Sequence, residues 1–165
     1  MKMNKKGFTL VELLAVIAIL AILVIIALPN VLELYRNARK NAFLDEVQSV
    51  YTAAVNKYML SQYGTSGAGA GTYYDVGGEG DNKLDIQNGS GTFKYCVQIN
   101  AVGEIEKLVA SNGTNHYDNG STVLKQAGDV KIAQVGPTGT GSDTTAKTAT
   151  YTAGQNDAPG TCSLS

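Results

Sequence analysis

Residues Lys5–Leu14 read KKGFTLVELL, and an apolar run follows them as far as Pro29. Leu13–Leu28 contains only Leu, Ala, Val and Ile. Phe8–Leu28 is about 21 residues, which is long enough to cross a bilayer as a helix. Glu12 is the exception, because a charge within hydrocarbon is costly and an acid at such a position is by default a functional candidate.

The hexapeptide Gly7-Phe8-Thr9-Leu10-Val11-Glu12, after a lysine leader and before an apolar helix, resembles the class III signal of type IV pilins. The resemblance covers roughly residues 5–35. It implies that a prepilin peptidase cuts after Gly7 and methylates the new N-terminal Phe8. It also implies that the subunits pack by their N-terminal helices into a filament, and that Met1–Gly7 is a leader outside the fold.

Glu12 has a specific role in such a filament. A cut after Gly7 gives Phe8 an α-amino group four residues before Glu12, in the same helix or facing a neighbouring copy. An amine and a carboxylate stabilise each other in a low dielectric only when both are present. We therefore expect Glu12 to set the register of packed helices.

An ordinary signal peptide or anchor is the alternative for this stretch. A secretory signal needs a small-x-small cleavage site after its apolar core, and Ala27-Leu28-Pro29-Asn30 offers no good one. A plain anchor explains neither Glu12 nor Gly7-Phe8. Pro29 lacks an N–H, so we expect a kink or local loosening of the helix there, with a role in assembly.

Length and charge limit what the rest of the chain can be. At 165 residues there is room for one domain. Losing Lys2, Lys5 and Lys6 with the leader leaves 10 of the 13 basic residues against 14 acidic ones, which argues against a nucleic-acid-binding head. The same lysines place the leader in the cytoplasm and the head outside.

The predicted fold is α+β and pilin-like, with a long protruding N-terminal helix packed on a small antiparallel β-sheet head. The helix runs from Phe8 to Gln62 and stops at Gly64. Its second half shows an apolar face at helical spacing. We expect a strand hairpin, 92–99 and 104–110 around Gly103, and weaker strands at 121–126, 130–135 and 147–152. The expected parts are a leader (1–7), a transmembrane or filament-core helix (8–29), an amphipathic helix (30–63) and a β head with a Gly-rich loop and C-terminal tail (64–165).

Cys96 and Cys162 are the only cysteines. An even count in an exported domain favours one disulfide over two free thiols. The bridge would close a loop of about 66 residues and contribute roughly 4 kcal/mol.

No catalytic or cofactor constellation emerges from the sequence. Gly67–Gly71 lacks the Lys-Ser/Thr of a phosphate loop, so no nucleotide is expected. The acidic residues of the loop 64–91 match no EF-hand spacing, and His116 reads as a loop residue without a nucleophile. Three Asn-Gly-Ser/Thr triplets, at Asn88, Asn112 and Asn119, read as turns rather than glycan acceptors. No metal site or enzyme is predicted.

The predicted function is a structural subunit that polymerises with identical copies into an extracellular pilus, for adhesion, twitching motility or DNA uptake. Its partners are the prepilin peptidase, the assembly machinery and, before assembly, the membrane. The assembled filament could bind a surface or DNA. A pseudopilin of a secretion or competence system, or a single-pass anchored binding module, are the alternatives.

Overall fold

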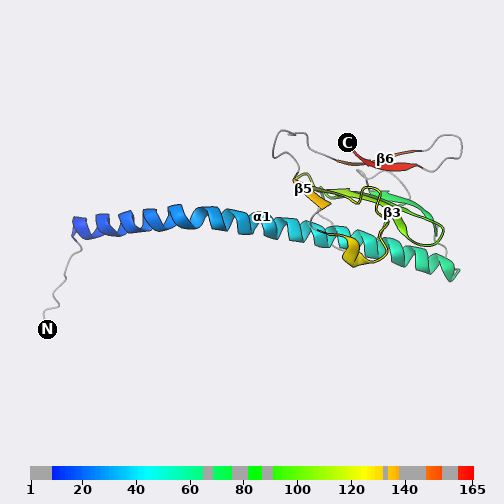
Figure 1. The fold of residues 1–165 in the computed structure, drawn as a ribbon, viewed down its shortest axis with the longest axis horizontal. Coiled ribbons are helices and arrows are strands. Elements are labelled where there is room, and N and C mark those ends of the chain that lie inside the picture. The colour runs from blue at the N-terminus through cyan, green and yellow to red at the C-terminus, as the bar shows by residue number, and fades with distance from the viewer. Residues whose placement is uncertain are drawn as a thin grey trace. The chain divides into compact units, whose positions relative to one another are not determined.

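The computed structural model describes residues 9–64, 69–75, 82–86, 91–131, 134–137, 148–153 and 160–165 (Figure 1). The predictions for Gly7, Phe8 and Asn88 lie outside these residues, as do Glu79 and Asp81, two of the acidic residues in the loop 64–91 for which no metal site is predicted. The chain divides into two compact units, Met1–Arg39 and Lys40–Ser165. The boundary falls inside the first helix, so each part of that helix is described with its own unit.

Helix α1 extends over Leu10–Gln62 and confirms the predicted helix and its end. From Leu10 to Arg39 every side chain is exposed, including Leu10 at 78% and Ile25 at 71%. By length and composition this part could cross a membrane, and its most apolar window has a mean hydropathy of 3.2. A helix that is apolar all round needs lipid or other apolar helices on every side.

Pro29 lies within α1 without ending it. The proline cannot donate a hydrogen bond to the carbonyl of Ile25, one turn earlier. Helical geometry nevertheless continues on both sides of Pro29. The expected role of Pro29 in assembly stays a prediction.

Five antiparallel strands form the main sheet of the second unit, and their spatial order is their order in the chain (Figure 1). The second half of α1 lies along one face of this sheet. This is the α+β, pilin-like arrangement that the sequence predicts. The strands are β1 (Gly71–Asp75), β2 (Lys94–Ile99), β3 (Ile105–Ser111), β4 (Asn115–Asp118) and β5 (Val135–Pro137).

The core forms between one stripe of α1 and the facing side of the sheet. The stripe follows the helical period, and its members are buried: Phe43, Val47, Val50, Tyr51 and Ala54. The sheet contributes buried aromatic and aliphatic side chains, among them Tyr73, Tyr95, Val97, Leu108 and Tyr117. The second half of α1 thus finds within its own chain the apolar contacts that residues 10–39 lack.

The two central tyrosines bury their rings and still satisfy their hydroxyls. The Tyr95 hydroxyl accepts the backbone N–H of Leu84 at 2.7 Å, and the Tyr117 hydroxyl donates to the side-chain oxygen of Gln134 at 3.2 Å. Burial raises the pKa of Tyr95 to about 12 and also raises the pKa of Tyr117. Both phenols therefore favour the neutral form in the folded head.

The predicted hairpin around Gly103 is confirmed, with β2 and β3 paired antiparallel. Gly103 has φ +86°, and a Cβ there would lie 2.4 Å from the ring of Tyr58. Asn100 closes the turn, since its side-chain oxygen accepts the N–H groups of Val102 and Glu104. The turn needs glycine for its backbone conformation and for the close approach of α1.

Two strands lie where the sequence predicted loops. β1 falls inside the expected surface loop 64–91 and pairs with β2 along its whole length. Its Thr-Tyr-Tyr core is β-prone, and Tyr73 is buried, so packing outweighs the flanking glycines. His116 lies in β4 rather than in a loop, beside Tyr117, whose buried ring anchors that short strand.

The predicted strand 121–126 is largely wrong, and of the described residues of the predicted strand 130–135 only Val135 lies in a strand. In the first segment Leu124 makes only an isolated bridge to Ile105. A 3-10 helix, η1 (Ala127–Asp129), follows, because the Asp129 carboxylate accepts the N–H groups of Lys125 and Gln126 and fixes a turn. These bonds, the one from Lys125 first, lower the pKa of Asp129. Of the second segment, Val135 begins β5.

The predicted strand at 147–152 exists as β6 (Ala149–Thr152), but it is not an edge of the main sheet. It pairs with β7 (Thr161–Leu164), which the sequence did not predict, in a separate two-stranded sheet. Cys96 and Val109 on the main sheet pack against Ala149 and Cys162. Since neighbouring strand residues alternate between faces, this small sheet covers the face opposite α1 (Figure 1).

Candidate functional site

The first turn of α1 is closed by a reciprocal pair of hydrogen bonds between Thr9 and Glu12. The Thr9 N–H donates to Glu12 Oε2 at 2.9 Å, and the Glu12 N–H donates to Thr9 Oγ1 at 3.4 Å. The Thr9 hydroxyl also donates to the same carboxylate oxygen, at 2.8 Å. This is a capping box, which satisfies amide donors that a helix start otherwise leaves without partners.

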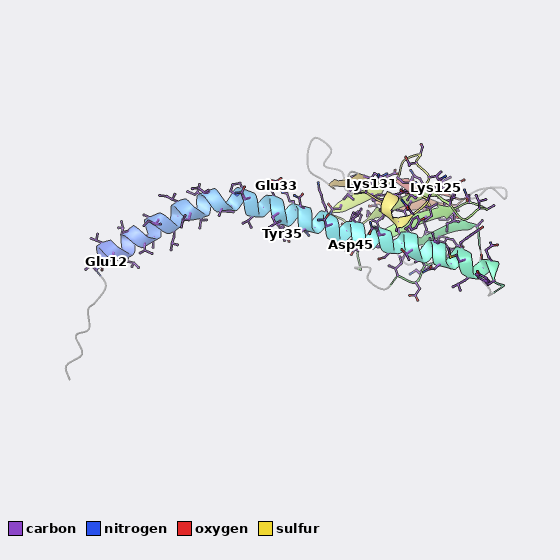
Figure 2. The ribbon with its side chains drawn as sticks, turned by 60° about the horizontal axis from the view of Figure 1, so that its bottom comes forward. Glu12, Glu33, Tyr35, Asp45, Lys125 and Lys131 are labelled. Carbon is purple, nitrogen blue, oxygen red and sulfur yellow. A yellow bond between two sulfur atoms is a disulfide. The ribbon has the colours of Figure 1, made fainter. Side chains whose placement is uncertain are left out.

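The capping box gives Glu12 a role inside its own helix. A carboxylate in the first turn is favoured by the positive end of the helix dipole. All the bonds that the carboxylate accepts from Thr9 end on Oε2, and Oε1 accepts none from the described residues. Figure 2 labels Glu12 at the start of α1. One oxygen therefore holds the helix start while the other is available to an external cation.

Thr9 is the site residue that the sequence analysis missed. The signal was present, because Thr9 and Glu12 are spaced as Thr-x-x-Glu directly before an apolar run, and this pattern marks a helix N-terminus. The same spacing gives Glu12 a partner in its own helix besides the amine expected from the cut after Gly7. The predictions for Gly7 and Phe8 are not tested by the described residues.

The predicted bridge between Cys96 and Cys162 is present. It joins β2 to β7 and lies in a small buried cluster with Val109 and Ala149. The rings of Tyr74 and Tyr151 stack beside it, with centroids 3.9 Å apart. The Ala149 N–H donates to Ser111 Oγ at 3.1 Å. The C-terminal segment is thus attached to the sheet covalently, by apolar contact and by hydrogen bonding.

The described acidic residues of the loop 64–91 and the asparagines of the Asn-Gly-Ser/Thr triplets have structural roles. Asp75 pairs with Lys83 at 3.4 Å, and the described residues contain no cluster of three or more His, Cys, Asp or Glu suited to a metal. Asn119 is buried at 3% exposure, and its amide donates to the carbonyls of Glu106 and Thr122. Both hydrogen bonds hold the Asn119 side chain within the head. Asn112 accepts the N–H groups of Thr114 and Asn115 and closes a turn, as predicted.

Comparison with known proteins bears on the N-terminal stretch. Residues 2–28 match the family model of the prokaryotic N-terminal methylation motif. No curated protein and no solved structure matches the chain. The matched residues include the capping box and the whole apolar run Leu13–Leu28 that precedes Pro29. Over residues 2–28 this chain carries the N-terminal methylation motif, which is the class III signal of type IV pilins.

Proposed function

We propose that this chain is the structural subunit of a type IV pilus. The methylation motif directly before α1 is the observation that carries the proposal. In this proposal the prepilin peptidase cuts after Gly7 and methylates Phe8. Identical subunits then polymerise into an extracellular filament with the help of the assembly machinery. Such a filament serves adhesion, twitching motility or DNA uptake. The motif points to a structural protein rather than an enzyme.

The exposed half of α1 supports polymerisation. Residues 10–39 expose aliphatic side chains around the whole helix, including Leu34 at 70%. Each such side chain is stabilised by roughly 1.5–3 kcal/mol when it leaves water. A membrane surrounds these apolar side chains before assembly, and the helices of other copies surround them afterwards. The motif and the apolar helix fit a membrane-anchored precursor.

Glu12 supplies the register of that polymer. Its Oε2 stays hydrogen-bonded to Thr9 in the capping box. Its Oε1 accepts a hydrogen bond from the α-amino group of Phe8 in an adjacent copy. The capping box orients the carboxylate before the amine arrives, so less side-chain freedom is lost on pairing. In an apolar bundle, the amine without this partner would be a buried unpaired charge, which costs several kcal/mol.

Processing is the test of this proposal. Subunits from sheared surface filaments should have the intact mass of residues 8–165 plus one methyl group. Gly7→Leu should block the cut and leave the precursor in the membrane. Gly91→Leu is the matched control, because a side chain at Gly91 meets open space. Filaments whose subunits still carry Met1 would contradict the proposal.

Imaging separates the pilus from the alternatives. Long surface fibres built of this chain favour the pilus, whereas short periplasmic assemblies favour a pseudopilin. A chain that keeps Met1 and never polymerises is an anchored binding module.

A further inference from the structure

The apolar part of α1 is bounded by two carboxylates whose spacing matches a membrane. Between Glu12 and Glu33 lie about 20 residues, Leu13–Leu32, which extend about 30 Å as a helix. The hydrocarbon core of a bilayer has the same thickness. Asn30 is the only polar residue in this stretch, and it lies within one turn of the outer end. This span begins and ends about four to five residues later than Phe8–Leu28, the segment considered from the sequence, and it removes Glu12 from the hydrocarbon. Glu12 and Glu33 then lie at its two surfaces, and residues just after Glu33 lie at the outer one.

The next turn of α1 carries an aromatic and two cationic side chains on one face. Tyr35, Arg36 and Arg39 follow Leu32 at the i+3, i+4 and i+7 positions, which share a face. All three are exposed, Tyr35 at 58%. Figure 2 labels Tyr35 and Glu33 on the part of α1 beyond the apolar run, on opposite sides of the helix. Tyrosine is enriched at membrane–water interfaces, where its ring and hydroxyl meet both media.

The direction of Arg39 places its charge at headgroup depth. The Arg39 guanidinium carbon lies 5.4 Å from the centroid of the Tyr35 ring, so the side chain reaches back one turn toward the apolar run. The Arg39 backbone is about 10 Å beyond Leu32, and one helical turn is about 5 Å. The guanidinium thus lies about 5 Å outside the hydrocarbon, within the headgroup layer.

Neither guanidinium has an acidic partner in the described part of the chain, where ion pairs form at Lys83, Lys107 and Lys125. Guanidinium matches the geometry of phosphate and binds it through two parallel hydrogen bonds. We infer that Tyr35, Arg36 and Arg39 form an interfacial anchor that binds the phosphates of anionic phospholipids. The anchor lies at the surface of the spanned membrane that faces away from the cytoplasm. The inference rests on the membrane-anchored stage of the proposed function.

The anchor fixes the depth of the precursor before assembly. Arginines near an anionic surface add to the attraction of the helix for that surface. With the anchor in the headgroups, the capping box of Thr9 and Glu12 stays at the opposite surface. A carboxylate of a second copy is the competing partner for Arg36 and Arg39. Lipid is favoured because the guanidinium depth and the interfacial tyrosine both match a headgroup layer.

The chain contains no Trp, so Tyr35→Trp introduces a single fluorophore and keeps an aromatic ring for Arg39. The full-length Tyr35→Trp chain is inserted into phosphatidylcholine vesicles that contain brominated phosphatidylglycerol or brominated phosphatidylcholine at equal mole fraction. Bromine near the headgroup should quench the indole more than bromine near the bilayer centre. The phosphatidylglycerol form should quench roughly two- to fivefold more strongly.

Charge removal then identifies the ligand site. Adding Arg36→Gln and Arg39→Gln to Tyr35→Trp should bring the quenching ratio of the two lipids to one. Lys5→Gln with Lys6→Gln, which removes two charges at the other end of the helix, should leave the ratio unchanged. So should Lys125→Gln with Lys131→Gln, which removes two exposed lysines of the second unit.

Three results would overturn the anchor. Equal quenching of the Tyr35→Trp chain by the two brominated lipids, or strongest quenching by bromine at the bilayer centre, contradicts the anchor. Neither result bears on polymerisation. A ratio of one together with reduced filament yield from Arg36→Gln and Arg39→Gln assigns the arginines to contacts between copies. Extraction of the chain from the vesicles by alkaline carbonate would show that α1 does not span the bilayer. It would contradict both the membrane-anchored precursor and the anchor.

Discussion

Residues 10–39 and residues 40–62 belong to the same helix, α1, but they bury their side chains to very different extents. The first part exposes every side chain, whereas the second buries a stripe from Phe43 to Ala54 against the sheet. Helical geometry is common to both parts, so backbone propensity does not distinguish them. The difference lies in where the apolar contacts come from, which is the head for the second part and other molecules for the first.

The largest expected effect concerns the first part, at Glu12. Glu12→Val removes the capping box and the partner of the Phe8 amine, and should reduce subunit in sheared filaments at least about tenfold, because a buried unpaired charge costs several kcal/mol. Insertion and cleavage should stay normal. The measurement is the ratio of filament subunit to membrane subunit.

Two matched variants separate the two roles of Glu12. Glu12→Gln keeps a capping side chain without charge, so its yield should fall between wild type and Glu12→Val. Thr9→Val keeps the charge and loses the cap, which should cost about 1 kcal/mol of helix stability and only a modest part of the yield. Wild-type yield from Glu12→Val would show that Glu12 does not carry assembly.

The next effect concerns the second part of α1. Phe43 is 1% exposed, and Phe43→Ala should lower the free energy of unfolding by about 3–5 kcal/mol because it opens a cavity in the core. Leu34→Ala, at a site that is 70% exposed, should change it by no more than about 0.5 kcal/mol. Urea unfolding of the full-length chain in detergent micelles, followed by tyrosine circular dichroism, measures both. Equal losses would mean that both parts of α1 are stabilised alike.

The disulfide gives a smaller effect, also confined to the second unit. Cys162→Ser should lower the free energy of unfolding by roughly 2–4 kcal/mol, because the chain between Cys96 and Cys162 regains freedom when unfolded. Reducing the wild-type bridge should give a similar loss and have little further effect on Cys162→Ser. Non-reducing peptide mapping of secreted protein should find the two cysteine peptides joined, and freely alkylated thiols would contradict the bridge.

The two parts of the chain also differ in how well the sequence predicted them. The helix and its approximate end near Gln62 were predicted, because local periodicity and the following Gly64 define them. The hairpin at Gly103 was predicted for the same reason, since its turn chemistry is local. The capping box is equally local, because the Thr-x-x-Glu spacing of Thr9 and Glu12 indicates it.

The rest of the head depends on contacts between distant residues. β1 becomes a strand because β2, some twenty residues later, pairs with it. β7 looks like a polar tail until Cys162 is joined to Cys96. In the segment 121–130, the Asp129 side chain replaces strand pairing with a turn. The cysteine count predicted the bridge, but no local pattern shows which strands pair or that Asp129 closes a turn, which is why the errors in strand assignment lie in the second unit.

The smallest effect tests the buried phenols of the head, and it should spare the first part of α1. Burial raises the folded pKa of Tyr95 to about 12 above its ordinary value of 10.0. A raised folded pKa means that the stabilisation is fully present below about pH 10 and is lost as the pH rises toward 12. Tyr117, raised in the same direction by burial, adds to this loss. The free energy of unfolding of the head should therefore fall between these pH values.

Tyr95→Phe should make that fall shallower, while costing about 1 kcal/mol at neutral pH because the Leu84 N–H loses its acceptor. Urea titrations of the full-length chain at several alkaline pH values measure the slope, and an unchanged slope in Tyr95→Phe would show that Tyr95 ionises equally easily in the folded and unfolded chain.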